Sequence, residues 1–353
     1  MSFKSLDPQD FLVSADSLTA PCWSNYAPEL STMFTSSTQV NGSSGTYFLN
    51  IYNANPDVSA SAEVQFNIAY GNKLGSGSVP YNASYENLTP TRTVYGQWRN
   101  LIYGDEFSNF SFGTGVSAVT PEMQHFYVIT LDRARYRQSL LPGSLNLTLY
   151  SGSFELNLTD NSGVVTTIEY CDAGRVYQVV SGSSGSPVSN AYNGYTANSG
   201  SYGLFLPDIG AIVLNASALD LPFTDGGIRL GTDLTSTAYN PGKLYTTNGT
   251  IGLLTGSAGF KSSFFLNSQE TVTSDFVFCR ARNGEFNYTE NPSFISGSTG
   301  AILYDLFINN PQTYITTVGL YNDQNELLAV AKLSKPLKKD FTKEALIRVK
   351  LDF

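Results

Sequence analysis

The chain has 353 residues, enough for two or three domains with buried cores. Only 14 % of the residues are charged, and glycine, serine, threonine and aromatic residues are abundant, so strands and turns are favoured over helices. The net charge of −9 disfavours a nucleic-acid-binding protein, which needs a basic surface. We therefore expect a mainly β fold of antiparallel sandwich-like or barrel-like domains with a few short helices.

The three cysteines, Cys22, Cys171 and Cys279, are too few and too far apart for a disulfide framework or a zinc site. We expect buried free thiols in a protein made in a reducing cytoplasm. The N-terminal residues lack the apolar core of a secretory signal, and no apolar run is long enough to span a membrane. These features predict no membrane partner and no glycosylation.

The first strands are expected only after an irregular beginning. Residues 1–35 show no alternation of apolar and polar side chains, which predicts irregular chain with short helical turns. Strands are expected at 46–52 and 63–71, where apolar side chains alternate with polar ones. Residues 71–92 are polar and rich in glycine, and we expect a long loop there.

Another strand is expected from residue 125, and it leads into three alternating arginines. If this strand continues to residue 137, Arg133, Arg135 and Arg137 lie on one side of it. Such a row of charges either contacts another subunit or forms a solvated edge that prevents further strand pairing.

A hairpin is predicted at 145–158, because leucine and phenylalanine residues alternate on both sides of a short turn. The next polar stretch, 181–203, contains almost no aliphatic residue, which predicts a surface excursion or a mobile loop and a domain boundary. We therefore divide the chain into an N-terminal β domain (1–180), a loop-rich β insertion or second domain (181–260) and a C-terminal β domain (261–353).

The C-terminal domain contains a predicted hairpin at 313–333 that is apolar on both sides. In its first strand, alternation places Tyr314, Val318 and Leu320 on one face. A hairpin that is apolar on both sides needs a cover on both sides, and we expect another subunit to supply one of them. The apolar side chains expected at this assembly interface are Tyr314, Val318, Leu320, Leu328 and Val330.

The end of the chain is basic. The segment from Lys332 to the last residue carries a net charge of +4, and the rest of the chain therefore carries −13. We include Lys338 and Lys339 in the expected assembly interface, because this asymmetry favours head-to-tail assembly of like subunits or docking on an acidic partner. A solvated strand face would explain the lysines equally well. Alternating apolar residues predict a final strand at 344–353 that packs in a sheet.

No group of residues predicts an enzyme. His125 is the sole histidine, so most metal sites and catalytic triads lack parts, and we expect it to be structural. The carboxylates of Asp105, Glu106, Asp172 and Asp225 are candidates for a hydrolase pair, but no local pattern singles them out. We therefore expect no catalytic residue, no cofactor and no metal site.

Five stretches carry a resemblance: "AYGNKLGSGS", "YGQWRNLIYGDE", "LDRARYRQSLLPG", "RNGEFNYTENPSF" and "TYITTVGLYNDQNELLAVAKLSKP". They resemble virion structural proteins of large contractile-tailed bacteriophages, notably cyanophage-type myoviruses. The resemblance covers the chain to about residue 180 and its last 80 residues. It implies a non-enzymatic virion component that is made in the host bacterial cytoplasm and binds other baseplate, tail or fibre subunits.

On this basis we expect a subunit of the baseplate or the tail periphery, including one that anchors fibres, present as a homo-oligomer or as symmetric copies. One alternative is a protein that decorates the capsid or neck. Another is a surface module that binds glycans or receptors. For such a module, Tyr192, Tyr195 and Tyr202 would form an exposed stacking platform.

Overall fold

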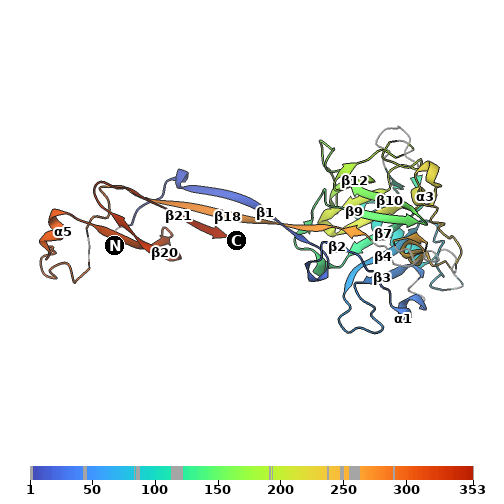
Figure 1. The fold of residues 1–353 in the computed structure, drawn as a ribbon, viewed down its shortest axis with the longest axis horizontal. Coiled ribbons are helices and arrows are strands. Elements are labelled where there is room, and N and C mark those ends of the chain that lie inside the picture. Colours follow the sequence, from blue (N-terminus) through green and yellow to red (C-terminus); the bar gives the residue numbers. More distant parts are fainter. Residues whose placement is uncertain are drawn as a thin grey trace. The chain divides into compact units, whose positions relative to one another are not determined.

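The computed structural model divides the chain into two units. Unit 1 comprises Met1–Ser17 and Thr271–Phe353, and unit 2 comprises Leu18–Glu270. Both consist mainly of antiparallel strands joined by turns and short helices (Figure 1), so the predicted fold class is confirmed. The structure describes residues 3–42, 46–82, 84, 88–112, 122–190, 192, 194–236, 238–246, 250–253, 263–288 and 291–352.

Unit 2 is built on one large antiparallel sheet, with the strand order β2-β17-β9-β10-β12-β14-β15-β7-β4-β3. The bounds along this order are β2 (Glu29–Leu30), β17 (Phe264–Phe265), β9 (Asn146–Ser151), β10 (Phe154–Asp160), β12 (Gly174–Ser183), β14 (Gly203–Leu206), β15 (Ala211–Asn215), β7 (His125–Leu131), β4 (Val64–Asn72) and β3 (Phe48–Tyr52). The shorter strands of unit 2 are β5 (Phe110–Ser111), β6 (Glu122–Met123), β8 (Ser139–Leu140), β11 (Glu169–Cys171), β13 (Ser186–Pro187) and β16 (Ile251–Gly252).

The large sheet has a hydrophobic core on each face. In β7, Tyr127 and Ile129 belong to the larger core cluster, whereas Phe126 and Val128 belong to the smaller one. Successive side chains of a strand point to opposite faces, so the unbroken apolar run of β7 is buried on both sides. The predicted 145–158 hairpin is confirmed as β9–β10, in which Leu147 pairs with Leu158.

The smaller core is covered by α2 (Pro90–Tyr103), which contributes Tyr95. The hydroxyl of Thr89 caps the helix by accepting a hydrogen bond from the N–H of Arg92 at 3.3 Å, and Gly104 ends it with a φ of +70°. The expected loop at 71–92 is therefore wrong in its first two residues, which end β4, and in its last three, since proline after threonine begins a helix. The shorter helices are α1 (Ser37–Val40), α3 (Ala216–Asp220), α4 (Asn240–Tyr245) and, in unit 1, α5 (Asp305–Asn309).

The stretch 181–203 is part of the folded unit and not a surface excursion. Its described residues include the end of β12, all of β13 and the start of β14, and both Ser201 and Tyr202 are buried. The hydroxyl of Ser181 donates to the carbonyl oxygen of Val188 at 2.7 Å. Short hydroxyl side chains can be buried without aliphatic neighbours when backbone acceptors satisfy them. The boundary expected between residues 180 and 181 falls inside β12.

Unit 1 contains a three-stranded path, β1-β18-β21, and a separate hairpin, β19–β20 (Figure 1). The expected final strand is confirmed, because β21 pairs with β18 from Asp352 opposite Ser274 to Ala345 opposite Ala281, while Phe353 lies outside the described residues. The unit boundaries fall within β1 and β18, and β8 pairs with the part of β18 in unit 2. The strands are β1 (Phe11–Pro21), β18 (Asn267–Ala281), β19 (Thr313–Tyr321), β20 (Leu327–Lys339) and β21 (Ala345–Asp352).

Unit 1 buries few apolar side chains. Of the 35 large apolar side chains that are exposed in the described residues, 19 belong to unit 1, although it holds only 17 residues of the N-terminal part and 83 of the C-terminal part. Burial of one such side chain contributes about 1.5–3 kcal/mol. Unit 1 therefore leaves much of its apolar surface in contact with water. Its buried apolar residues in the described part are Val277, Ala281, Ala345 and Val349.

We expect Gly227→Ala to destabilise unit 2. A β-carbon at position 227 would lie 2.0 Å from the carbonyl oxygen of Leu221, which is a backbone atom. Relief of this overlap should cost about 1–3 kcal/mol of unfolding free energy, measured by urea denaturation. Gly96→Ala in α2 is the control, since nothing lies within 4 Å of an added β-carbon there. Equal stability of the two variants would contradict the packing at Gly227.

Candidate interaction surfaces

The three arginines do not form a row along one strand. β7 ends at Leu131, and the carboxylate of Asp132 then accepts a hydrogen bond from the N–H of Ala134 at 2.9 Å. Residues Arg133–Arg135 form a short 3-10 turn. The expectation that the strand continues to residue 137 is wrong, because an aspartate that bonds to the backbone two residues on favours a turn.

Two of these arginines have partners within unit 2. Arg133 donates to the carbonyl oxygen of Tyr136, and its guanidinium carbon lies 4.7 Å from the centroid of that ring. Arg137 forms an ion pair with Glu270 at 2.5 Å. The ion pair compensates the charge of Arg137, whereas Arg133 keeps its charge, and the role of both residues in an assembly interface stays a prediction.

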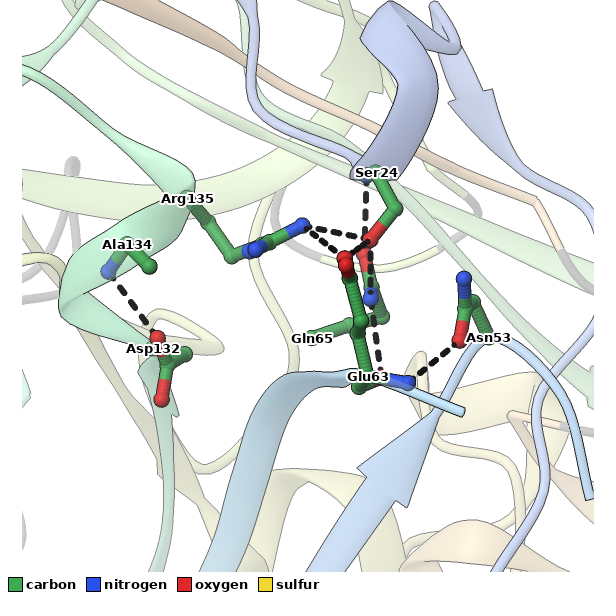
Figure 2. A network of polar contacts seen from close by, with 7 residues as sticks. All are labelled: Ser24, Asn53, Glu63, Gln65, Asp132, Ala134 and Arg135. Carbon is green, nitrogen blue, oxygen red and sulfur yellow. Dashed lines mark hydrogen bonds and ion pairs between the residues drawn. The ribbon is translucent and has the colours of Figure 1, made fainter. Parts of the chain in front are cut away.

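Arg135 belongs to a polar network that holds the turn at Ser24 against the residues that lead into β4 (Figure 2). Its guanidinium contacts the hydroxyl of Ser24 and lies 2.9 Å from a carboxylate oxygen of Glu63. The Ser24 hydroxyl also donates to Glu63 at 2.6 Å, while the N–H of Ser24 donates to the amide oxygen of Gln65 at 3.0 Å. Four side chains thus fix one another in a single arrangement.

This network has the parts of a structural clamp and lacks the usual base of a serine nucleophile. The one histidine of the chain is absent from it, and the hydrogen bond from Ser24, with the charge of Arg135, lowers the pKa of Glu63, which makes it a weaker base. The clamp adjoins Asn25 and Tyr26, whose φ angles of 60° and 56° are unusual for residues other than glycine. Its contacts help to hold this strained backbone.

The β19–β20 hairpin contains a bulge that the sequence does not reveal. The strand register shifts between Ile315 and Thr317, so the alternation of side chains changes there. Tyr314 is exposed, whereas Val318 and Leu320 are half-buried. The expectation that these three residues share one face is therefore wrong.

The exposed face of this hairpin forms an apolar patch around Gly319. A β-carbon on Gly319 would lie 2.9 Å from the ring of Tyr321 and 3.3 Å from Leu327, so both side chains lie beside this glycine. Val330 pairs with Gly319 across the hairpin and is exposed, as is Leu328. We call Tyr321, Leu327, Leu328 and Val330 the hairpin patch. Contiguous exposed apolar surface is a common feature of interaction sites.

The two lysines at the end of β20 differ in their surroundings. Lys339 is 0 % exposed, and its ammonium group donates to the amide oxygen of Asn287 at 2.7 Å and to the carbonyl oxygen of Asn283 at 3.1 Å. Lys338 is exposed, and its ammonium nitrogen lies 4.0 Å from the carboxylate of Asp340. Lys338 is accessible to a partner, whereas Lys339 fixes the loop that follows β18.

A further apolar surface lies on β1, where the sequence predicted irregular chain. Phe11, Leu12 and Val13 are consecutive and exposed, so apolar side chains stand on both faces of this strand. Three strand-favouring residues in a row were the one feature of the sequence that could have predicted this strand. They lack the polar alternation that identifies a half-buried strand.

The three tyrosines of the polar stretch do not form one exposed platform. Tyr202 is 0 % exposed, and its hydroxyl donates to the carbonyl oxygen of Gly226 at 2.7 Å. Tyr192 is half-buried, and its hydroxyl donates to Asn198 at 2.6 Å. Tyr195 is also half-buried. The expectation of an exposed Tyr202 is wrong, because its hydroxyl has an internal acceptor.

Among the candidate carboxylates, Asp105 is held within its own turn. The carboxylate of Asp105 accepts hydrogen bonds from Ser108 and from the N–H of Phe107, and these bonds lower its pKa. Asp172 lies beside Gly104. In the part of the chain that the structure describes, no three His, Cys, Asp or Glu side chains are grouped as a metal site would require.

Comparison of the chain with protein-family models, with curated proteins and with solved structures finds no match. Among the described residues, no helix combines the length and the apolar character that crossing a membrane requires.

We expect Lys339→Met to loosen the loop at 283–287. The methionine fills similar space but donates no hydrogen bond, so Asn283 and Asn287 each lose a contact. Hydrogen exchange of the loop amides should accelerate by roughly tenfold, since a hydrogen bond to a charged group contributes about 1.5–3 kcal/mol. Lys338→Met is the matched control and should leave exchange unchanged. Slow exchange in both variants would show that Lys339 does not hold the loop.

We also expect part of the acid sensitivity of the protein to depend on His125. Burial lowers the pKa of this imidazole below its ordinary value of 6.5. The imidazole therefore binds a proton more readily in the unfolded chain than in the folded one. The contribution of neutral His125 to the free energy of unfolding is complete above pH 6.5, and it is lost as the pH falls through the lower pKa of the folded state. In urea denaturation from neutral pH to about pH 5, the free energy of unfolding should fall less steeply for His125→Gln than for the unmodified protein. A slope equal to that of the unmodified protein would refute this assignment.

Proposed function

We propose that this protein is a structural subunit of a tailed-phage virion, located at the baseplate or the tail periphery, and that it acts by protein–protein assembly without catalysis. Unit 1 is the part that docks on neighbouring subunits. The observation that carries the proposal is the exposed hairpin patch, in a unit that buries few apolar side chains. Apolar surface exposed to water gains free energy when a partner covers it.

Charge supports a protein partner for this hairpin. Lys332, Lys335 and Lys338 are exposed along β20, the strand that carries Leu328 and Val330. Basic side chains beside an apolar patch favour a partner whose surface is apolar at the centre and acidic around it. A baseplate, tail or fibre subunit with such a surface is the proposed neighbour.

The likeness of five segments to virion proteins of contractile-tailed phages supports the location. In that setting the chain is made in the host bacterial cytoplasm and is then incorporated into the particle. Decoration of the capsid or neck would use the same patch, and the distribution of the protein between heads and tails separates the two locations. Glycan binding has less support, since Tyr202 is buried.

We expect Val330→Asp to prevent incorporation into particles. The substitution places a carboxylate in the hairpin patch at a side chain that is 58 % exposed, so folding should be little affected. A phage that lacks the gene is complemented with each variant, and the protein is quantified by mass spectrometry in separated heads and tails. Incorporation into tails should fall by about tenfold or more, as for loss of an interface hot spot.

Val164→Asp is the matched control, because Val164 is 56 % exposed and lies in unit 2. It should be incorporated like the unmodified protein. Enrichment in heads would favour capsid or neck decoration over the tail. Absence of the unmodified protein from particles would refute the virion role, and equal incorporation of both variants would refute the role of the hairpin.

A further inference from the structure

The sheet of unit 1 has two free edges. In its strand order, β1-β18-β21, the central β18 is paired on both sides (Figure 1). Within the described residues of unit 1, no other strand pairs with the outer edge of β1 or of β21. A free edge presents unpaired N–H and C=O groups, which form a template for another strand.

The edge at β1 carries exposed apolar side chains and lacks the usual protection. Natural edge strands are blunted by lysine, proline, bulges or a covering segment. Between Phe11 and Ser17, β1 contains no lysine and no proline, and its one charged residue is Asp16. Its apolar residues Phe11 to Val13 are exposed on both faces. This edge therefore favours pairing with another strand whose apolar side chains cover the exposed residues of β1.

The two edges carry opposite charge. The segment 3–17, which leads into and forms β1, has three aspartates and one lysine and a net charge of −2. The strand β21, residues 345–352, has two basic residues and one acidic residue and a net charge of +1. On β21 itself, Arg348 and Lys350 are exposed. One copy of the chain thus offers an acidic edge and a basic edge on the same sheet.

We propose that a second copy of this chain covers β1, with β21 of that copy pairing along the outer edge of β1. This extends the proposed assembly role by naming one partner. Contact between like edges would place carboxylates against carboxylates or basic side chains against basic ones, which is destabilising. Contact between unlike edges joins opposite charges, and β21 brings the exposed Leu346 to the apolar part of β1.

This pairing generates a head-to-tail oligomer. β1 and β21 lie at opposite edges of one sheet, so the two edges of a copy face two different neighbours. Repetition of such a head-to-tail contact closes into a ring when its rotation permits. The chain should therefore associate into three or more copies, and each copy extends the sheet of the next.

Native mass spectrometry and light scattering of the full-length protein test this inference, with Val13→Lys as the variant. Val13 is 67 % exposed on β1, and a lysine there removes apolar contact and opposes the basic edge of β21. The unmodified protein should form a ring, and Val13→Lys should weaken its association by roughly tenfold or more, with unchanged thermal melting. Val58→Lys is the matched control, since Val58 is 83 % exposed in unit 2.

Cross-linking identifies the edges in contact. An equal mixture of ordinary and ¹⁵N-labelled protein is treated with a carbodiimide, which joins carboxylates directly to lysine amines. Mixed-isotope products should join Asp10 or Asp16 to Lys343 or Lys350. A monomer or a dimer throughout the micromolar range, absence of these mixed products, or equal association of Val13→Lys and Val58→Lys would overturn the inference.

These results are separable from the virion role. Val330→Asp should form the same ring as the unmodified protein, because the hairpin patch lies outside the proposed strand pairing. A protein that fails to form a ring but enters particles through the hairpin patch would refute the self-association alone. A ring-forming protein that is absent from particles would refute the virion role alone.

Discussion

Apolar burial is the constraint on which the rest of this structure depends. In unit 2, apolar side chains on both faces of β7 meet two separate cores, and α2 supplies Tyr95 to one of them. In unit 1, the path β1-β18-β21 and the β19–β20 hairpin bury only a few small or medium apolar residues. Two or three strands need a further layer for a core of their own. The proposed assembly with other chains would supply such a layer.

Polar contacts replace part of the missing core in unit 1. The hydroxyl of Ser274 donates to Asp352 at 2.6 Å and joins the middle of β18 to the end of β21. Arg348 lies 5.2 Å from the ring centroid of Phe276 on the adjacent strand. Lys339 fixes the loop after β18 through two oxygen atoms. These contacts specify strand positions but bury little apolar surface, so they order the unit and leave its apolar side chains exposed.

Regular strands were predictable from the sequence because their side-chain period is local. β4, β9–β10 and β21 follow the alternation of their residues. Predictions failed where one residue changed the path: Asp132 ended β7 in a turn, and the bulge after Ile315 moved Tyr314 to the exposed side. Of the predicted interface residues, Leu328, Val330 and Lys338 are exposed, as is Tyr314.

By itself, the sequence determined the mainly β class, the C-terminal hairpin and the final strand, because residue type and alternation act over a few neighbouring positions. Only the tertiary structure decided which apolar residues stay exposed and that Lys339 is buried while Lys338 is not. It also decided that β1 and β21 are the free edges of one sheet. The physical reason is that burial and edge position depend on contacts between segments far apart in the chain, and no local pattern specifies them.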